Sequence, residues 1–247
     1  MPDPVAAAIR RRRHPAQARR EAELAHETDL RRAFFWAAFK VLRFNGIDGD
    51  YVEFGSDGAI TFRLAFDRMR DLGPARHLWA FDSFAGLPES SDDRDRHPRW
   101  IARSMATDLA TFHQICRGHG MPPDSYTAVA GFYDDTLRAM SPADPPTNIA
   151  LAYIDCDMYS STKAVLDFLA PRLKHGMILA FDDYFCWAAD ELSGERRAFL
   201  EAFGGAEGLN GRWNLVPYRD IGWVGASFMV ERADLARPRE ESATRAG

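Results

Sequence analysis

The alternation of apolar and helical segments is the feature that most restricts the fold of this chain. Short apolar runs predict strands at 51–55, 78–84, 127–132, 149–155 and 177–182. Between them lie stretches with helical periodicity, at 59–72, 105–119, 134–140 and 160–173. Parallel neighbouring strands need a crossover, which is usually a helix. The alternation therefore predicts βαβ units in a doubly wound, mainly parallel α/β sheet.

The beginning of the chain departs from this alternation. Residues 1–20 are rich in Arg, Ala and Pro and predict a flexible arm. The RRRR run inside this arm could instead bind nucleic acid or a partner subunit. Residues 21–46 repeat apolar side chains at a helical period, which predicts a helix that caps the core or forms the seam of a homo-oligomer.

The end of the chain also differs. After a predicted helix at 194–203, the apolar runs 213–219 and 226–232 flank a short loop that contains glycine. This pattern predicts a terminal hairpin with one strand antiparallel to the rest of the sheet. We expect one domain over 47–233 and a disordered tail over 234–247.

Composition narrows the class of protein. A length of 247 residues suits one large α/β domain, and a net charge of -5 disfavours a generic nucleic-acid-binding surface. Three cysteines without a C-x-x-C spacing support neither a disulfide framework nor a zinc site, and predict a reducing cytoplasm. No apolar run approaches the roughly 20 residues that cross a bilayer, so we expect no membrane-spanning segment.

Acidic residues mark the ends of nearly all the predicted strands. Because parallel strands end at the same edge of a sheet, these carboxylates should share one rim, where their repulsion and lost hydration favour a bound cation or a ligand rich in hydroxyls. The acids concerned are Glu53, Asp82, Asp155, Asp157, Asp182 and Asp183.

The first strand and turn suggest a nucleoside-type ligand. Gly55 and Gly58 lie where a strand gives way to a helix, so a ligand could approach the backbone there, although such a turn is often only structural. Asp82 ends the next strand, where a carboxylate commonly accepts hydrogen bonds from ribose hydroxyls. The alternative is that Asp82 caps the turn that follows it.

The later strand ends suggest a metal site. Asp155, Asp182 and Asp183 are separated by one helix and one strand, so they should converge on neighbouring strand ends. Three hard oxygen donors suit Mg²⁺ or another divalent cation. We expect Asp157 to cap the next helix, with a role as a fourth ligand as the alternative.

Several motifs, in this order, resemble the macrocin O-methyltransferase (TylF-type) family of S-adenosylmethionine-dependent enzymes. The resemblance runs from about residue 49 to about residue 230 and is carried by YVEFG, FDSFAGLPE, GFYDDTL, IDCDMYSSTKAVLDFL, PRLKHGMILAFDDYF and GERRAF. It implies a Rossmann-like class I methyltransferase with a seven-stranded sheet. The implied reaction is Mg²⁺-assisted methyl transfer to a hydroxyl of a small molecule, such as a sugar or natural-product scaffold.

The resemblance also implies residue roles. Asp155, Asp182 and Asp183 would hold the metal, with Asp155 also the general base. A second set would contact S-adenosylmethionine or lie beside it, and comprises Glu53, Gly55, Asp82, Ser83 and Asp135. Residues 90–104 correspond to a lid over the substrate. Aromatic side chains near the rim could exclude water or stack on an acceptor, or could simply belong to the core; they are Phe84, Trp100, Phe185 and Trp187.

Two other functions use the same features. The D-x-D and later DD acids also occur in metal-dependent glycosyl or phosphoryl transferases, although Tyr159 stands where a D-x-D-x-T phosphatase has Thr. An Arg-rich arm on a methyltransferase-like fold could instead serve a non-catalytic nucleic-acid-binding protein. That protein would bind in a salt-sensitive way and lose binding without the arm.

Overall fold

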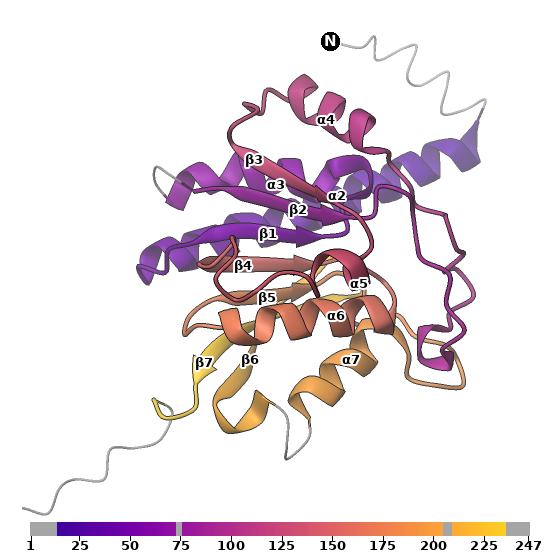
Figure 1. Ribbon diagram of the computed structural model, residues 1–247. Helices are drawn as coiled ribbons and strands as arrows, with labels where there is room; N and C mark the ends of the chain where they lie inside the picture. The colour runs from indigo at the N-terminus through magenta and orange to yellow at the C-terminus, as the bar shows by residue number, and fades with distance from the viewer. Residues whose placement is uncertain (1–13, 73–75, 205–208, 236–247) are drawn as a thin grey trace, which may run out of the picture.

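A computed structural model of the protein describes residues 14–72, 76–204 and 209–235 (Figure 1). Its strands form one seven-stranded sheet in the order β3-β2-β1-β4-β5-β7-β6. The strands are β1 (Asp50–Phe54), β2 (Leu78–Asp82), β3 (Tyr126–Ala130), β4 (Ile149–Ile154), β5 (Ile178–Phe181), β6 (Trp213–Ile221) and β7 (Gly225–Arg232). Strands β1 to β5 pair in parallel, whereas β7 is antiparallel to both β5 and β6. The predicted mainly parallel sheet with an antiparallel C-terminal strand is confirmed.

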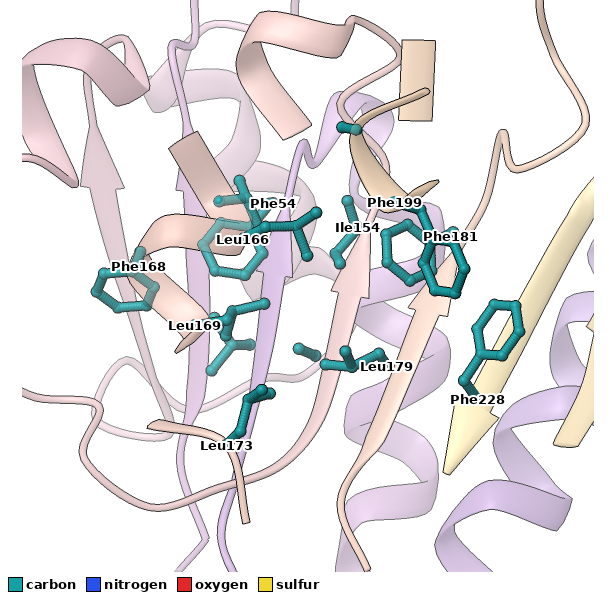
Figure 2. Close-up of a cluster of buried hydrophobic side chains, with 14 of the residues drawn as sticks. Phe54, Ile154, Leu166, Phe168, Leu169, Leu173, Leu179, Phe181, Phe199 and Phe228 are labelled. Atoms are coloured by element: carbon teal, nitrogen blue, oxygen red, sulfur yellow. The ribbon is translucent and has the colours of Figure 1, made fainter. Parts of the chain in front are cut away.

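Helices cover both faces of the sheet. One face packs against α2 (Pro15–Phe44), α3 (Ile60–Met69) and α4 (Leu109–Gly118), and the other against α6 (Tyr159–Leu169) and α7 (Gly194–Phe203). On the second face, Phe54 of β1 packs edge-on against Phe168 of α6, with ring centroids 5.9 Å apart, and Phe181 of β5 meets Phe199 of α7 at 5.4 Å (Figure 2). Because helices bury both faces of the sheet, a ligand site is expected at the ends of the strands.

Helix α2 begins at Pro15, so the flexible arm predicted over 1–20 is wrong for residues 15–20; the Arg run of residues 10–13 lies outside the described residues. Proline suits the first turn of a helix, and the Ala, Gln, Arg and Glu residues that follow are strong helix formers. The second half of α2 packs into the core through residues such as Phe35, which stacks on Tyr153 with centroids 5.3 Å apart. The helix therefore caps the sheet, as predicted.

The first half of α2 differs from the second. Among the described residues of α2, no side chain before Phe34 is buried. The helix also exposes Leu24 (54%), Trp36 (52%) and Phe44 (90%), and a homo-oligomer formed through it stays a prediction. None of the described helices combines the length and the apolar character that are needed to cross a bilayer.

Some elements are shorter than predicted because the local backbone ends them. Strand β2 stops at Asp82, since Phe84 has a φ of 51° that no strand tolerates. Helix α4 starts at Leu109, after Asp108 accepts a hydrogen bond from the backbone N–H of Thr111. Helix α5 covers only Tyr133–Thr136. The predicted hairpin is confirmed, with slightly longer strands.

Candidate active site

A cavity of about 1090 Å³ opens along the carboxyl edge of the sheet. Its walls are the loops that follow the strands, the long connection between β2 and α4, and the first half of α2, which extends past the strand ends (Figure 1). Of the predicted site residues, those that line it are Gly55, Asp82, Ser83, Asp155, Asp182 and Asp183. A volume of this size is enough for a drug-sized ligand and part of a second one.

The three acids predicted as metal ligands do converge. One carboxylate oxygen from each of Asp155, Asp182 and Asp183 lies within 4.8 Å of the others. Burial and the charges of Asp182 and Asp183 raise the pKa of Asp155 well above its usual range. The ends of β4 and β5 are adjacent in the sheet, which is why acids so far apart in sequence meet.

Asp182 already has two partners in the protein. The guanidinium of Arg31 on α2 donates to both of its carboxylate oxygens, Nε to Oδ1 at 3.0 Å and Nη2 to Oδ2 at 2.5 Å. The hydroxyl of Tyr153 also donates to Oδ1. Burial opposes the charged form of Arg31, but its hydrogen bond to Asp182 raises the pKa of the guanidinium overall. The first half of α2 is thereby tied to the acid cluster.

Asp157 does not cap helix α6, so that prediction is wrong. The residue has a left-handed φ of 59°, and its side chain lines the cavity. Burial and the neighbouring Asp183 raise its pKa, while a hydrogen bond from Trp100 opposes this shift. The first turn of α6 is capped from a distance, because the Asp95 carboxylate accepts a hydrogen bond from the backbone N–H of Ser160 at 2.7 Å.

The turn after β1 requires a glycine at position 55. Gly55 has a φ of 88°, and a Cβ atom there would lie only 1.8 Å from the carbonyl oxygen of Asp155. The glycine therefore permits the ends of β1 and β4 to approach, in addition to lining the cavity. Asp82 accepts hydrogen bonds from the backbone N–H groups of Ser56 and Phe84, both at 2.6 Å. It caps the turn, as the alternative held, and a carboxylate with two such bonds still has lone pairs free to accept further hydrogen bonds.

Two residues predicted to contact the donor do not line the cavity. Glu53 is fully buried, and its carboxylate accepts hydrogen bonds from Tyr51 and Thr61, so Thr61 rather than Glu53 lines the cavity. Burial raises the pKa of Glu53 to about 8. Asp135 is exposed and does not line the cavity. Its neighbour Asp134 lines the cavity instead. Adjacent residues of a helical turn point in different directions, and the motif could not tell which acid faces inward.

The predicted lid is packed against helices α6 and α7. Within 90–104, Arg94 stacks on the ring of Tyr159 at 4.1 Å and donates to its hydroxyl, and Trp100 lines the cavity. Phe185 and Trp187 line the cavity too, whereas Phe84 is partly buried and packs against the core, on Phe112 of α4.

Sequence reasoning missed three residues of the site. Arg31 is one of several arginines in α2, and its spacing does not distinguish it from the others. Glu195, in the first turn of α7, accepts hydrogen bonds from the backbone N–H groups of Cys156 and Asp183. Trp223 lies in the turn between β6 and β7 and lines the cavity. No local pattern indicated these roles, since each depends on a contact with a distant segment.

Comparison with known proteins agrees with this geometry. The sequence matches the family described as macrocin-O-methyltransferase (TylF) over residues 11–210. It is 33% identical over 147 residues to the 8-demethyl-8-(2,3-dimethoxy-alpha-L-rhamnosyl)-tetracenomycin-C 4'-O-methyltransferase of Streptomyces olivaceus, covering 57% of this chain and 54% of that enzyme. The chain thus spans about half the length of this curated relative.

Solved structures give the same fold. The O-methyltransferase NovP superposes with a TM-score of 0.63 at 22% identity, over 82% of this chain and 80% of NovP. The calicheamicin methyltransferase CalS11 superposes with a TM-score of 0.62 at 27% identity, over 82% of this chain and 78% of CalS11. The sheet order and the antiparallel last strand are those of a Rossmann-like class I methyltransferase. Since the family match covers most of the sequence, this chain belongs to the macrocin O-methyltransferase (TylF) family.

Proposed function

We propose that the protein is an S-adenosylmethionine-dependent, Mg²⁺-assisted O-methyltransferase that acts on a hydroxyl of a sugar or other natural-product scaffold. The observation that carries the proposal is one cavity that contains both the glycine turn after β1 and the acid cluster of β4 and β5. The Streptomyces olivaceus relative is named for methylation at the 4' oxygen of a rhamnosylated tetracenomycin, which supports a sugar hydroxyl as the acceptor.

The residues of the cluster fit a divalent cation. Asp155, Asp182 and Asp183 offer hard oxygen donors at mutually short distances, and Asp157 and Glu195 add to the negative charge around them. Among the described residues, Arg31 is the cationic side chain that forms a salt bridge with this cluster, and it pairs with Asp182. A bound Mg²⁺ would supply positive charge that lowers the pKa of an acceptor hydroxyl.

The protein's own residues would then align the reaction and remove a proton. Methyl transfer is an in-line displacement, in which the acceptor oxygen forms a bond to the methyl carbon as the bond from carbon to sulfur breaks. The proton of the hydroxyl goes to the Asp155 carboxylate, and S-adenosylhomocysteine leaves with the sulfur electron pair. Gly55, Asp82 and Ser83 would hold the donor on the β1 and β2 side of the cavity. Trp100 would exclude water from the acids.

Binding of the donor tests the first part of the proposal. S-adenosylmethionine or S-adenosylhomocysteine at about 100 times its Kd should stabilise the protein by about 2.7 kcal/mol. For a chain of this size, that gain corresponds to a rise in Tm of about 5 to 10 °C. A melting curve that neither ligand shifts at millimolar concentration would refute the proposal. Methyl transfer to sugar, catechol and polyketide hydroxyls, measured with and without chelator, then tests the acceptor class and the metal separately.

The aromatic wall should contribute to acceptor binding. Trp223, which is 68% exposed, lines the cavity with Phe185 and Trp187, and such faces stack on sugar or aromatic rings. We expect Trp223→Ala to raise the acceptor KM about 3- to 10-fold with little change in kcat. Trp36→Ala is the matched control, because Trp36 is also exposed but lies outside the cavity wall. Equal KM values for the two variants would exclude this role.

A further inference from the structure

The side chain of Glu195 connects the two loops that carry the acid cluster. It is fully buried in the first turn of α7. Its Oε1 atom accepts a hydrogen bond from the backbone N–H of Cys156 at 3.3 Å, and Oε2 accepts one from Asp183 at 3.0 Å. Cys156 follows the end of β4 and Asp183 follows the end of β5, so one carboxylate bridges the backbones of both loops.

A second contact joins the start of α7 to the same loops. Gly194 has a φ of 61°, and a Cβ atom there would lie 2.7 Å from the carbonyl oxygen of Asp157 and 2.3 Å from the ring of Trp100. Asp157 itself holds a left-handed φ of 59°, which is uncommon for a residue with a side chain. Close packing against α7 thus accompanies an unusual backbone conformation between Asp155 and α6.

The charge on Glu195 is costly for the protein alone. A fully buried carboxylate needs compensation, and within the described part of the chain no Lys, Arg or His forms a salt bridge with it. Burial, together with repulsion by Asp183 and Asp157, raises the pKa of Glu195 well above its usual range. A neutral side chain could accept one backbone N–H without this repulsion. The placement is understandable if a cation is bound among the acids.

We propose that Glu195 is a positioning residue for the metal site. By accepting the N–H groups of Cys156 and Asp183, it holds the β4 and β5 loops at the separation at which Asp155 and Asp183 share one cation. Its negative charge further favours that cation. This inference rests on the proposed function, in which these acids hold a divalent ion. Residues in direct hydrogen-bond contact with ligand-bearing segments typically change metal affinity 10- to 100-fold when they are replaced.

The test uses the full chain and Mn²⁺ as the probe, with free Mn²⁺ measured by electron paramagnetic resonance. Glu195→Gln keeps the size of the side chain but removes its charge and one of its two acceptor oxygens. We expect the Kd for Mn²⁺ to rise about 10- to 100-fold. The metal-free variant should melt within about 5 °C of the wild type, because relief of the repulsion among the acids offsets the loss of one buried hydrogen bond. The thermal shift by S-adenosylhomocysteine should be retained, and higher Mn²⁺ should restore kcat.

Glu201→Gln is the matched control. Glu201 is on the same helix and also accepts hydrogen bonds, but these come from the side chains of Tyr159 and Arg197 and not from the backbone of either acidic loop, so the Kd for Mn²⁺ should be unchanged. If Glu195→Gln does not fold, Glu195→Asp replaces it: its shorter side chain cannot reach both N–H groups and should also weaken Mn²⁺ binding.

Two results would overturn the inference, and they differ. A wild-type Kd for Mn²⁺ in the folded Glu195 variants removes the positioning role and leaves the proposed function intact. Absence of Mn²⁺ binding by the wild-type protein removes the metal from the proposed function and this inference with it. The shift by S-adenosylhomocysteine reports the donor site in either case.

Discussion

Asp155→Asn should lower kcat for methyl transfer by about 10³-fold. The substitution keeps the shape of the side chain but removes both the proton acceptor and one of the three convergent carboxylates. The measurement is steady-state kcat with the best acceptor from the hydroxyl screen, at saturating donor and Mg²⁺. Asn should fold well here, since burial and the repulsion by neighbouring acids, which together raise the pKa of Asp155, no longer act on a carboxylate.

The control for this prediction is donor binding. S-adenosylhomocysteine should still raise the Tm of the Asp155→Asn variant, because the donor is proposed to lie on the β1 and β2 side of the cavity. Asp157→Asn provides the comparison that can contradict the assignment. If that variant binds Mn²⁺ normally and loses more kcat than Asp155→Asn, the proton is accepted by Asp157 and not by Asp155.

Arg31→Met should have the largest effect on stability among the site residues. The change leaves Asp182, which is 5% exposed, without its bidentate cation. Breaking a fully buried pair costs about 3 to 5 kcal/mol. Because the Arg31 side chain is 21% exposed, we expect a smaller loss of about 2 to 3 kcal/mol in the free energy of unfolding. The Tm should fall by about 4 to 12 °C.

The neighbouring residue gives the matched control for Arg31. Arg32 pairs with Asp29 at 3.0 Å, but both side chains are largely exposed, so Arg32→Met should change stability by less than about 1 kcal/mol. Added Mg²⁺ should stabilise Arg31→Met more than the wild type, since the ion would supply charge that the guanidinium no longer provides. Equal melting temperatures for the Arg31 and Arg32 variants would show that the ion pair does not secure α2 to the acid cluster.

Much of the site could be predicted because its residues belong to regular elements. Asp155, Asp182 and Asp183 each follow an apolar run, and parallel strands bring such ends to one edge of the sheet. Gly55 was identifiable for a similar reason, since a strand that turns sharply into a helix needs a residue that tolerates a positive φ. For these four residues, the local sequence pattern and the sheet topology together were enough to predict their positions.

The residues whose places differ from the expected ones depend on side-chain direction. Glu53 ends in the core, with Tyr51 and Thr61 as its partners, although its place in the motif suggested the cavity. Asp157 turns to the cavity, and Asp95 takes over the cap of α6 from a loop that no local pattern connects with that helix. A hydrogen bond of this kind depends on where the backbone brings two distant segments.

By itself the sequence determined the type and order of the elements, the antiparallel end of the sheet and the edge at which the acids gather. Periodicity and strand direction are local properties that a chain carries along its length. Only the tertiary structure decided that Arg31 of α2 neutralises Asp182 and that Glu195 of α7 bridges the two acidic loops. From the sequence alone, a charged side chain on a helix, such as Arg31 or Glu195, could equally well extend into solvent. Packing of the helix against the sheet selects the one that reaches the site.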